Sequence, residues 1–174
     1  MAKFWSDTNL EPKRQHRWAL SIPGINNMRF YLTKTDKPSL QISETEHKFF
    51  GHSFWYPGHL TWQPLQMTLV DPFGNLGTSG RLKTVLERSG YMPPEEAALP
   101  LTLSKKNTVN ATGGKMLLRQ YAANEDGEAV EKEIWKLERA WFSRINFGTL
   151  DYNSDAMVTV DVTVRYDWAT VVHK

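Results

Sequence analysis

Histidines and nearby carboxylates are the first residues that could do chemistry. His47, His52 and His59 follow Glu44 and Glu46 in one short stretch, which places nitrogen and oxygen ligands within reach of one metal ion. The stretch contains neither a His-x-Glu motif nor a pair of histidines four residues apart, and it has no helical pattern. We therefore expect surface histidines here and no metal site.

Paired carboxylates, serine nucleophiles and a phosphate loop are the other chemistries to consider. Asp161 and Asp167 lie on the polar face of a predicted strand, where a solvated charge is the ordinary role. The glycine-rich run 74–81 precedes a predicted helix, but it lacks the spacing and the lysine of a phosphate-binding loop, so a helix-capping turn explains it better. Asp151 and Asp155 could also supply paired carboxylates, but nothing in the sequence around them indicates an acid–base pair. The candidate serine nucleophiles lack the sequence context of a nucleophile elbow; they are Ser53, Ser79 and Ser89. We expect no catalytic residue, no cofactor and no enzyme activity.

Composition limits the class of protein. The chain has 174 residues with a formal net charge of +2, which fits one domain and gives no strongly basic surface for nucleic acid. It contains no cysteine, which excludes disulfides, thiolate metal sites and cysteine nucleophiles. We expect neither a secretory signal nor a membrane anchor, because no apolar leader or long apolar run occurs.

Alternation of apolar and polar residues predicts several strands. The clearest is one long antiparallel strand from Val158 to Trp168, with valines on one face and polar residues on the other. The short link 23–27 predicts a hairpin between the first two strands. The other predicted strands cover 18–22, 28–33, 62–69 and 115–121, and a short one at 99–103 lies in the otherwise linker-like segment 91–114.

One helix is predicted at about 78–90. Leu82, Val85 and Leu86 share one face, while Thr78 or Ser79 supplies the N-cap and Gly90 ends the helix. With several strands and hairpin turns around a single helix, the chain is predicted to be a mostly-β sandwich or barrel.

The segment 128–141 carries conflicting signals. Its apolar residues Val130, Ile134, Leu137 and Trp141 have helical spacing, and the residues between them are good helix formers. The turn sequence at 124–127 indicates instead the second arm of a hairpin with 115–121. The residues alone leave both interpretations open.

Aromatic residues are numerous, with seven Trp, six Tyr and eight Phe. Those on predicted strands are expected in the core, namely Trp18, Phe30, Trp62, Tyr166 and Trp168. Five more fall in the irregular segment 40–60: Phe49, Phe50, Phe54, Trp55 and Tyr56. Such a cluster either folds back as a lid on the core or forms a partner interface, and we favour the interface because aromatic residues are enriched there.

The C-terminal third resembles a known family. The ordered set consists of Leu118–Ala122, Glu131–Ile134, Asn146–Tyr152 and the strand Val158–Trp168. In this order and composition it is similar to the tail tube proteins of T-even-type contractile bacteriophages. The resemblance covers residues 115–169 well and residues 17–90 loosely, where the order of elements agrees but most residues do not.

The resemblance implies a structural role. It implies two packed antiparallel sheets with one flanking helix, in subunits that form hexameric rings and stack into a hollow tube lined by a large β-barrel. Double-stranded DNA would pass through the lumen without specific binding, and the partners would be the tail sheath, baseplate and tail terminator proteins. The expected location is the virion tail, assembled in the host cytoplasm. The family has a strand where 130–137 lies, so a strand is expected there, with a bulge near Trp135–Leu137.

Domain organisation follows from these expectations. We expect an N-terminal arm over 1–16 and a single domain over 17–174, in which the segment 40–60 contacts the next ring. Near-neutral charge suits a conduit for DNA, and the lumen is expected to be acidic or mixed. Alternative functions are a baseplate protein or tube initiator, the tube of a secretion system or extracellular contractile particle, and a small β-barrel enzyme or ligand-binding module.

Overall fold

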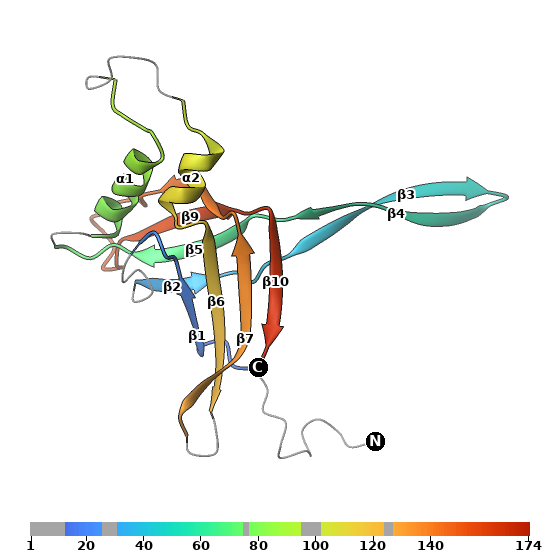
Figure 1. Ribbon diagram of the computed structural model, residues 1–174, viewed down its shortest axis with the longest axis horizontal. Helices are drawn as coiled ribbons and strands as arrows, with labels where there is room; N and C mark the ends of the chain where they lie inside the picture. The colour runs from blue at the N-terminus through green and yellow to red at the C-terminus, as the bar shows by residue number, and fades with distance from the viewer. Residues whose placement is uncertain (1–12, 26–30, 75–76, 95–101, 124–126) are drawn as a thin grey trace.

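The computed structural model describes residues 13–25, 31–74, 77–94, 102–123 and 127–174. These residues are mainly in antiparallel strands, with two short helices (Figure 1). In chain order the elements are β1 (Trp18–Ser21), β2 (Leu32–Thr35), β3 (Leu40–Phe49), β4 (His52–Trp62), β5 (Leu65–Val70), α1 (Thr78–Arg88), α2 (Lys105–Ala111), β6 (Lys115–Ala123), β7 (Ala129–Glu138), β8 (Trp141–Asn146), β9 (Thr159–Arg165) and β10 (Trp168–His173).

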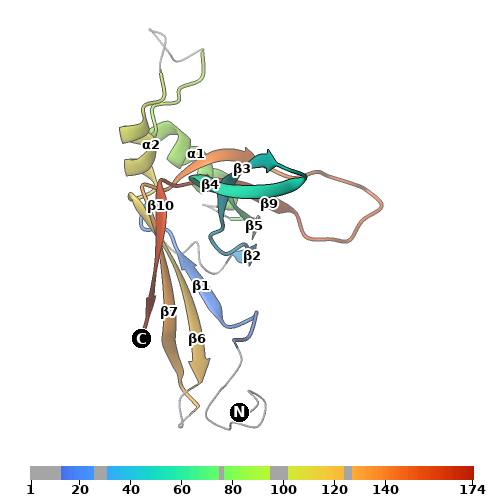
Figure 2. The same ribbon diagram turned by 90° about the vertical axis from the view of Figure 1, so that its right-hand side faces the viewer.

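Two four-stranded sheets form the body of the protein. Sheet A has the order β1-β6-β7-β10 and sheet B the order β2-β5-β9-β8, and neighbouring strands in both are antiparallel. The strands of the two sheets cross steeply, and the helices lie together at one end of the sandwich (Figures 1 and 2). Strands β3 and β4 pair only with each other, as a separate hairpin. The predicted fold of two packed antiparallel sheets is therefore confirmed.

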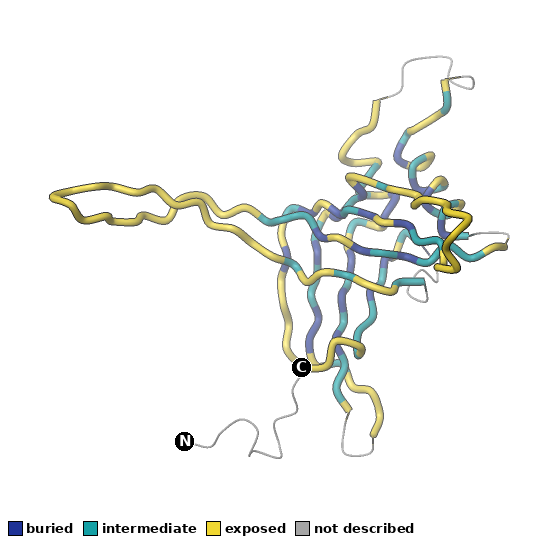
Figure 3. The backbone as a smooth tube through the Cα atoms, turned by 180° about the vertical axis from the view of Figure 1, so that it is seen from behind, coloured by how far each residue is buried: buried dark blue, intermediate teal, exposed yellow. Residues whose placement is uncertain are grey.

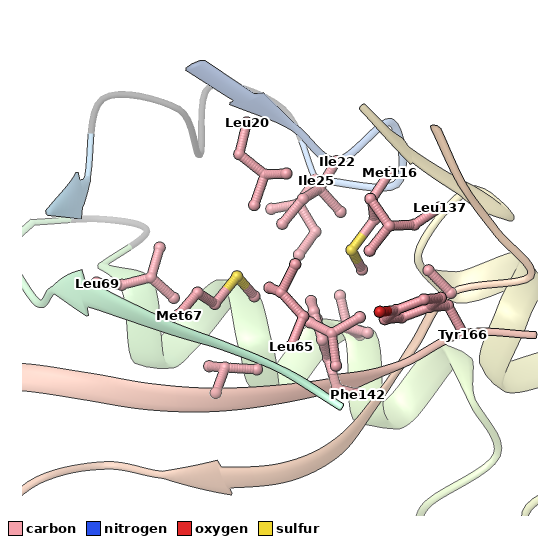
Figure 4. Close-up of a cluster of buried hydrophobic side chains, with 14 of the residues drawn as sticks. Leu20, Ile22, Ile25, Leu65, Met67, Leu69, Met116, Leu137, Phe142 and Tyr166 are labelled. Atoms are coloured by element: carbon pink, nitrogen blue, oxygen red, sulfur yellow. The ribbon is translucent and has the colours of Figure 1, made fainter. Parts of the chain in front are cut away.

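The hydrophobic core lies between the sheets, where the buried residues gather (Figure 3). The central strands β5, β6 and β9 turn alternate residues inward, as the pleat requires. Leu20, Met116 and Leu137 come from sheet A and meet Met67 and others from sheet B (Figure 4). The remaining fully buried side chains of sheet B are Leu65, Leu69, Val160, Val162 and Val164.

Helix α1 confirms the predicted helix, with Leu82 and Val85 buried on its inner face. The predicted N-cap is wrong, because Gly77 occupies that position and provides no side-chain hydrogen bond. Asp71, from the end of β5, takes over the capping role: its carboxylate accepts hydrogen bonds from the Ser79 backbone N–H (3.1 Å) and from the Ser79 hydroxyl. A residue seven positions before the helix start thus satisfies one of its free N–H groups.

A second helix, α2, lies in the segment predicted to be linker-like. Ser104 is its N-cap, and the Ser104 side chain accepts a hydrogen bond from the Asn107 backbone N–H at 3.1 Å. The helix is short and buries only Ala111 among its own residues, so it has no apolar periodicity for the sequence to display. Most of the predicted strand at 99–103 lies outside the described residues, and Thr102 and Leu103 are not in a strand.

The predicted single strand over Val158–Trp168 is wrong. Strand β9 ends at Arg165 in sheet B, and β10 begins at Trp168 in sheet A. The switch follows from Tyr166, whose side chain is buried, and from the Asp167 backbone N–H, which donates to the Glu138 carbonyl at 3.0 Å and brings the chain beside β7. A continuous alternating pattern therefore covers two strands of different sheets.

Most of the segment 128–141 is a strand, β7 (Ala129–Glu138), as the family resemblance implied, and Trp141 begins the next strand, β8. The irregularity lies earlier than expected, because the register shifts where Gln120 faces Glu133 and Tyr121 faces Glu131. Lys132 is thus the extra residue of a β-bulge. The turn predicted before the strand, at 124–127, lies outside the described residues except for Gly127.

The first two predicted strands do not form a hairpin with each other. Strand β1 belongs to sheet A and β2 to sheet B, while residues 26–30, including Phe30, lie outside the described residues. Of the other aromatic residues expected in the core, Tyr166 is buried, whereas Trp18 and Trp62 are half-buried and pack against the core. Trp168 is exposed, because it follows the change of sheet and faces away from the core.

Candidate assembly interface

The hairpin of β3 and β4 extends far from the body of the protein (Figure 1). Every residue from Leu40 to Thr61 is exposed, so the hairpin has no core of its own and none shared with the sheets (Figure 3). The aromatic segment 40–60 is therefore a regular hairpin rather than an irregular loop, and it does not fold back as a lid on the core.

The turn at the tip has a sequence that does not predict a hairpin. Phe50 and Gly51 have φ values of 48° and 75°, so the two-residue turn is left-handed at both positions. Such turns normally use Asn-Gly or Asp-Gly, and a bulky residue with positive φ is unusual. The strands also lack simple alternation, because neither face of the hairpin is covered by the core.

Cross-strand pairing assigns the hairpin side chains to two faces, since directly paired residues point to the same side. One face of the outer half, here called the aromatic face, carries the pairs Thr45–Tyr56, His47–Phe54 and Phe49–His52. The other, the carboxylate face, carries Glu44–Pro57, Glu46–Trp55 and Lys48–Ser53. A β-bulge opposite Ser43 separates this outer half from the base.

The five aromatic residues singled out in the sequence are thus divided. Phe49, Phe54 and Tyr56 share the aromatic face, Trp55 lies on the opposite face, and Phe50 lies at the tip with 84% of its surface exposed. The rings of Phe49 and Phe50 meet edge to face at 4.4 Å between centroids. The base of the hairpin adds a further apolar strip, formed by Leu40, Ile42 and Leu60.

The exposure of this hairpin points to a partner. A two-stranded hairpin without packing on either face is marginally stable in water at best. Contiguous exposed apolar surface is rare on monomers and marks interaction sites. Either face of the hairpin therefore gains stability when another protein surface covers it.

Sheet B offers a second feature suited to assembly. Its outer strands β2 and β8 each have one edge without a neighbouring strand among the described residues. Its outward face is polar, because Gln66, Thr68, Asp161 and Thr163 all point away from the core. Two hydrogen bonds run across this face, Thr68 Oγ1 to Asp161 Oδ1 and Thr163 Oγ1 to Gln66 Oε1, both 2.8 Å. Sequence analysis had not identified these edges, because edge position is a property of the sheet order.

The aspartates and serines considered as catalytic groups lie either in hydrogen bonds within the protein or on its exposed surface. Asp167 accepts hydrogen bonds from Lys105 (2.7 Å) and Arg139 (3.4 Å), which lower the pKa of its carboxyl, the Lys105 hydrogen bond most. An open groove of about 720 Å³ lies beside Asp167, between the helices and β8. Asp151 and Asp155 are exposed in the segment 147–158, which projects from the end of sheet B (Figure 2). Ser79 bonds to Asp71, and Ser53 to Glu46 at 2.6 Å.

The histidines and glutamates considered as metal ligands, and expected to be surface residues, lie along the exposed hairpin. His47 and His52 point to the aromatic face, whereas Glu44 and Glu46 point to the carboxylate face. Within the described residues, no three His, Asp or Glu side chains are grouped so that they could hold a metal ion. In the same part of the chain, neither helix has the length and apolar character needed to cross a bilayer.

The fold is similar to that of solved proteins from contractile injection systems. A chain in the six-fold symmetrised baseplate of the anti-feeding prophage matches with a TM-score of 0.61 and 16% identity, covering 94% of this chain and 97% of that one. A chain in the extended sheath–tube complex of the extracellular contractile injection system PVC matches with a TM-score of 0.61 and 12% identity, covering 94% and 93%. A chain in the tube-terminating cap of the anti-feeding prophage has a TM-score of 0.56 and 13% identity, covering 94% and 93%.

These likenesses confirm, at the level of the fold, the resemblance to the tube family of contractile systems. No protein-family model matches the sequence, and neither does any curated protein sequence. The likeness is therefore one of tertiary structure, in matches that cover over nine-tenths of each chain at low sequence identity.

Proposed function

We propose that this chain is a structural tube protein of a contractile tail, which assembles into hexameric rings that stack as a hollow conduit. The observation that carries the proposal is a long exposed aromatic hairpin on a fold that chains of contractile injection systems match over 94% of its length. The six-fold symmetry of the matched baseplate supports six copies per ring. The role is structural, and the chain is not an enzyme.

Ring closure joins the free edges of sheet B. The sheet has four strands of alternating direction, so β8 of one copy and β2 of a rotated neighbour are antiparallel when they meet. Repeating this contact around an axis continues the alternation, closes a large β-barrel and leaves sheet B without a free edge. A contact between two different edges also suits a ring, since head-to-tail interfaces close by rotation.

The polar face of sheet B lines the conduit in this arrangement. Gln66, Thr68 and Thr163 supply uncharged hydrogen-bonding groups at its centre. The charged residues on the same face are Lys34, Arg144, Asp161 and Arg165, so the wall carries charges of both signs with cations in excess. Uncharged side chains interrupt the cations, so that DNA meets no continuous phosphate-binding track and slides through without specific binding.

Stacking uses the hairpin. Each hairpin reaches the next ring, where its aromatic face becomes buried and the marginal pairing of β3 with β4 gains support. Phe49, Phe50, Phe54, Trp55 and Tyr56 remain the proposed inter-ring residues, with Phe49, Phe54 and Tyr56 forming the largest continuous part. The outer surface of the tube then meets the tail sheath, and its ends meet the baseplate and terminator proteins.

Negative-stain microscopy and light scattering of the purified protein test the proposal. We expect rings or tubes with a central hole and a ring mass of six chains. A stable monomer at all concentrations, with no rings or tubes, would contradict it.

Variants of the hairpin test the stacking role separately. Replacing both Phe54 and Trp55 with Ser should leave folded rings and abolish tubes. Among single variants, Phe54→Ser should shorten tubes more than Trp55→Ser. The reason is that Phe54 lies beside the other aromatic side chains of the aromatic face, whereas Trp55 lies on the opposite face. The control is Thr45→Ser with Thr61→Ser, which keeps every aromatic side chain. Long tubes in the Phe54/Trp55 double variant, equal to those of the control, defeat the stacking role.

A second candidate function is a baseplate or cap protein that ends or initiates a tube. Chains of a baseplate and a tube-terminating cap share the fold, so the fold alone fits this role as well. Copy number distinguishes the two functions, because a tube protein is present in many rings per particle and an initiator in one. Capsid genes beside the gene favour a phage virion, and their absence favours a secretion system or extracellular particle.

A further inference from the structure

The direction of the β3–β4 hairpin depends on its root, since residues 40–61 are all exposed and only Trp62, the last residue of β4, packs against the core. The root has two links to the body, residues 36–39 before β3 and residues 63–64 after β4. Backbone hydrogen bonds hold these links to sheet B and to each other: the Asp36 N–H donates to Gln66 O at 3.0 Å, and the Gln63 N–H donates to Ser39 O at 2.9 Å. These contacts hold the root to sheet B.

Lys37 adds a contact between the root and sheet A. From the link before β3, its ammonium donates to Glu133 Oε1 at 2.8 Å and to Gln120 Oε1 at 2.7 Å, both on the inner face of sheet A. Lys37 thus joins the hairpin root, which belongs to sheet B, to the centre of the opposite sheet.

Glu133 gathers several segments that are distant in sequence. It is only 3% exposed, and its carboxylate also accepts hydrogen bonds from Lys13, which precedes β1, and from Trp135 Nε1 at 2.6 Å. His173 Nδ1, on the terminal strand β10, lies 3.9 Å from Glu133 Oε2. One buried anion therefore contacts the N-terminal segment, the hairpin root and strand β10.

A buried carboxylate is a costly choice for stability alone. Desolvating a charge offsets most of what its partners return, and apolar residues of similar size often stabilise a core equally well. What an apolar residue cannot do is hold two lysines at defined positions. The arrangement at Glu133 thus favours a role in geometry.

We propose that Glu133 is a positioning residue for assembly, which sets the direction of the β3–β4 hairpin through Lys37. Glu133 touches no partner itself; it acts through the root of the hairpin. The consequence for tubes rests on the proposed function, whereas the consequence for hairpin direction does not.

Spin-label distances test the hairpin direction. Because the chain has no cysteine, Lys48→Cys on the hairpin and Thr170→Cys on β10 create a unique labelled pair. Labelled chains are diluted in excess unlabelled chains, so that only distances within one molecule are measured. We expect a narrow distance distribution in the parent, a wider and displaced one in Glu133→Gln, and no change in Glu131→Gln. Glu131 is the matched control, since it lies on the same strand and pairs with Arg119 and Lys174 near the surface.

Lys37→Met is the second variant, for the case that Glu133→Gln does not fold. It removes the cation from the hairpin root and leaves Glu133 with Lys13 and Trp135, and it should widen the distribution in the same way. Lys34→Met on β2 is its control. A parent-like distribution in Lys37→Met, or in folded Glu133→Gln, overturns the proposal.

Microscopy of the same variants separates this proposal from the proposed function. A wider distribution together with lost tubes supports both. A wider distribution with normal tubes supports the positioning role and counts against the hairpin as the stacking element. An unchanged distribution counts against the positioning role, whether or not tubes form.

Discussion

Protonation of Glu133 should lower the free energy of unfolding measurably, and the size of this loss follows from the contacts of the carboxylate. Burial raises the pKa of the Glu133 carboxyl, but hydrogen bonds from Lys13, Lys37 and Trp135 outweigh this and lower it from 4.5 to about 2. Each pKa unit corresponds to ~1.4 kcal/mol. Relative to its protonated form, the carboxylate therefore contributes roughly 3 kcal/mol to the free energy of unfolding at neutral pH.

The sign of the pH dependence is fixed by the lowered pKa. The contribution is fully present above the unfolded pKa of 4.5 and is lost as the pH falls through about 2. At about pH 3, roughly 1 kcal/mol of it should remain. Glu133→Gln mimics the protonated side chain, so the difference between parent and variant should shrink from roughly 3 kcal/mol at about pH 7 to roughly 1 kcal/mol at about pH 3.

The assay is urea unfolding of both proteins at several pH values, at concentrations where light scattering shows monomers. The pKa values of Glu131 and Asp167 are also lowered, by hydrogen bonds from Lys174 and Lys105 above all, so both proteins lose stability in acid. Subtracting the variant from the parent cancels that shared loss. A difference that does not change with pH would refute the reasoning.

Three further predictions concern the core, a close backbone contact and the hairpin. Leu137→Ala should lower the free energy of unfolding by ~2–5 kcal/mol, whereas Leu150→Ala, at a side chain 87% exposed, should leave it nearly unchanged; urea unfolding measures both. Gly24→Ala should cost ~1–3 kcal/mol, since a Cβ there would meet the backbone of Ala111 and Thr112, while Gly80→Ala in helix α1 has open space and should stabilise by ~0.5–1 kcal/mol. A melting temperature of Gly24→Ala equal to that of the parent protein would contradict the close backbone contact at Gly24. Replacing residues 41–61 with Asn-Gly should change the free energy of unfolding by less than ~1 kcal/mol, because this segment is exposed throughout; a collapse of the fold on deletion shows that the hairpin supports the core.

Local patterns predicted the parts of the fold that are covered on one side. Helix α1 has its apolar face against the core, and the alternating valines of β9 face inward, so the period of each could be read directly. The β3–β4 hairpin was not predicted in this way because both of its faces are exposed. Without a covered face, a strand need not alternate apolar and polar residues. The five aromatic residues lie on one hairpin, as their closeness in the chain suggests, but their division between two faces required the register of β3 with β4.

The sequence by itself determined the mainly β class, the position of helix α1, the inward faces of the strands and the excess of aromatic residues in 40–60. Each depends on neighbours along the chain. The tertiary structure decided which strands lie side by side: that the chain changes sheets at Tyr166, that β2 and β8 form the edges of sheet B, and that Lys13 and Lys37 meet at Glu133. The physical reason is that a side-chain pattern records which face of an element is buried, whereas the identity of the neighbouring strand is fixed only when the two sheets pack around a common core.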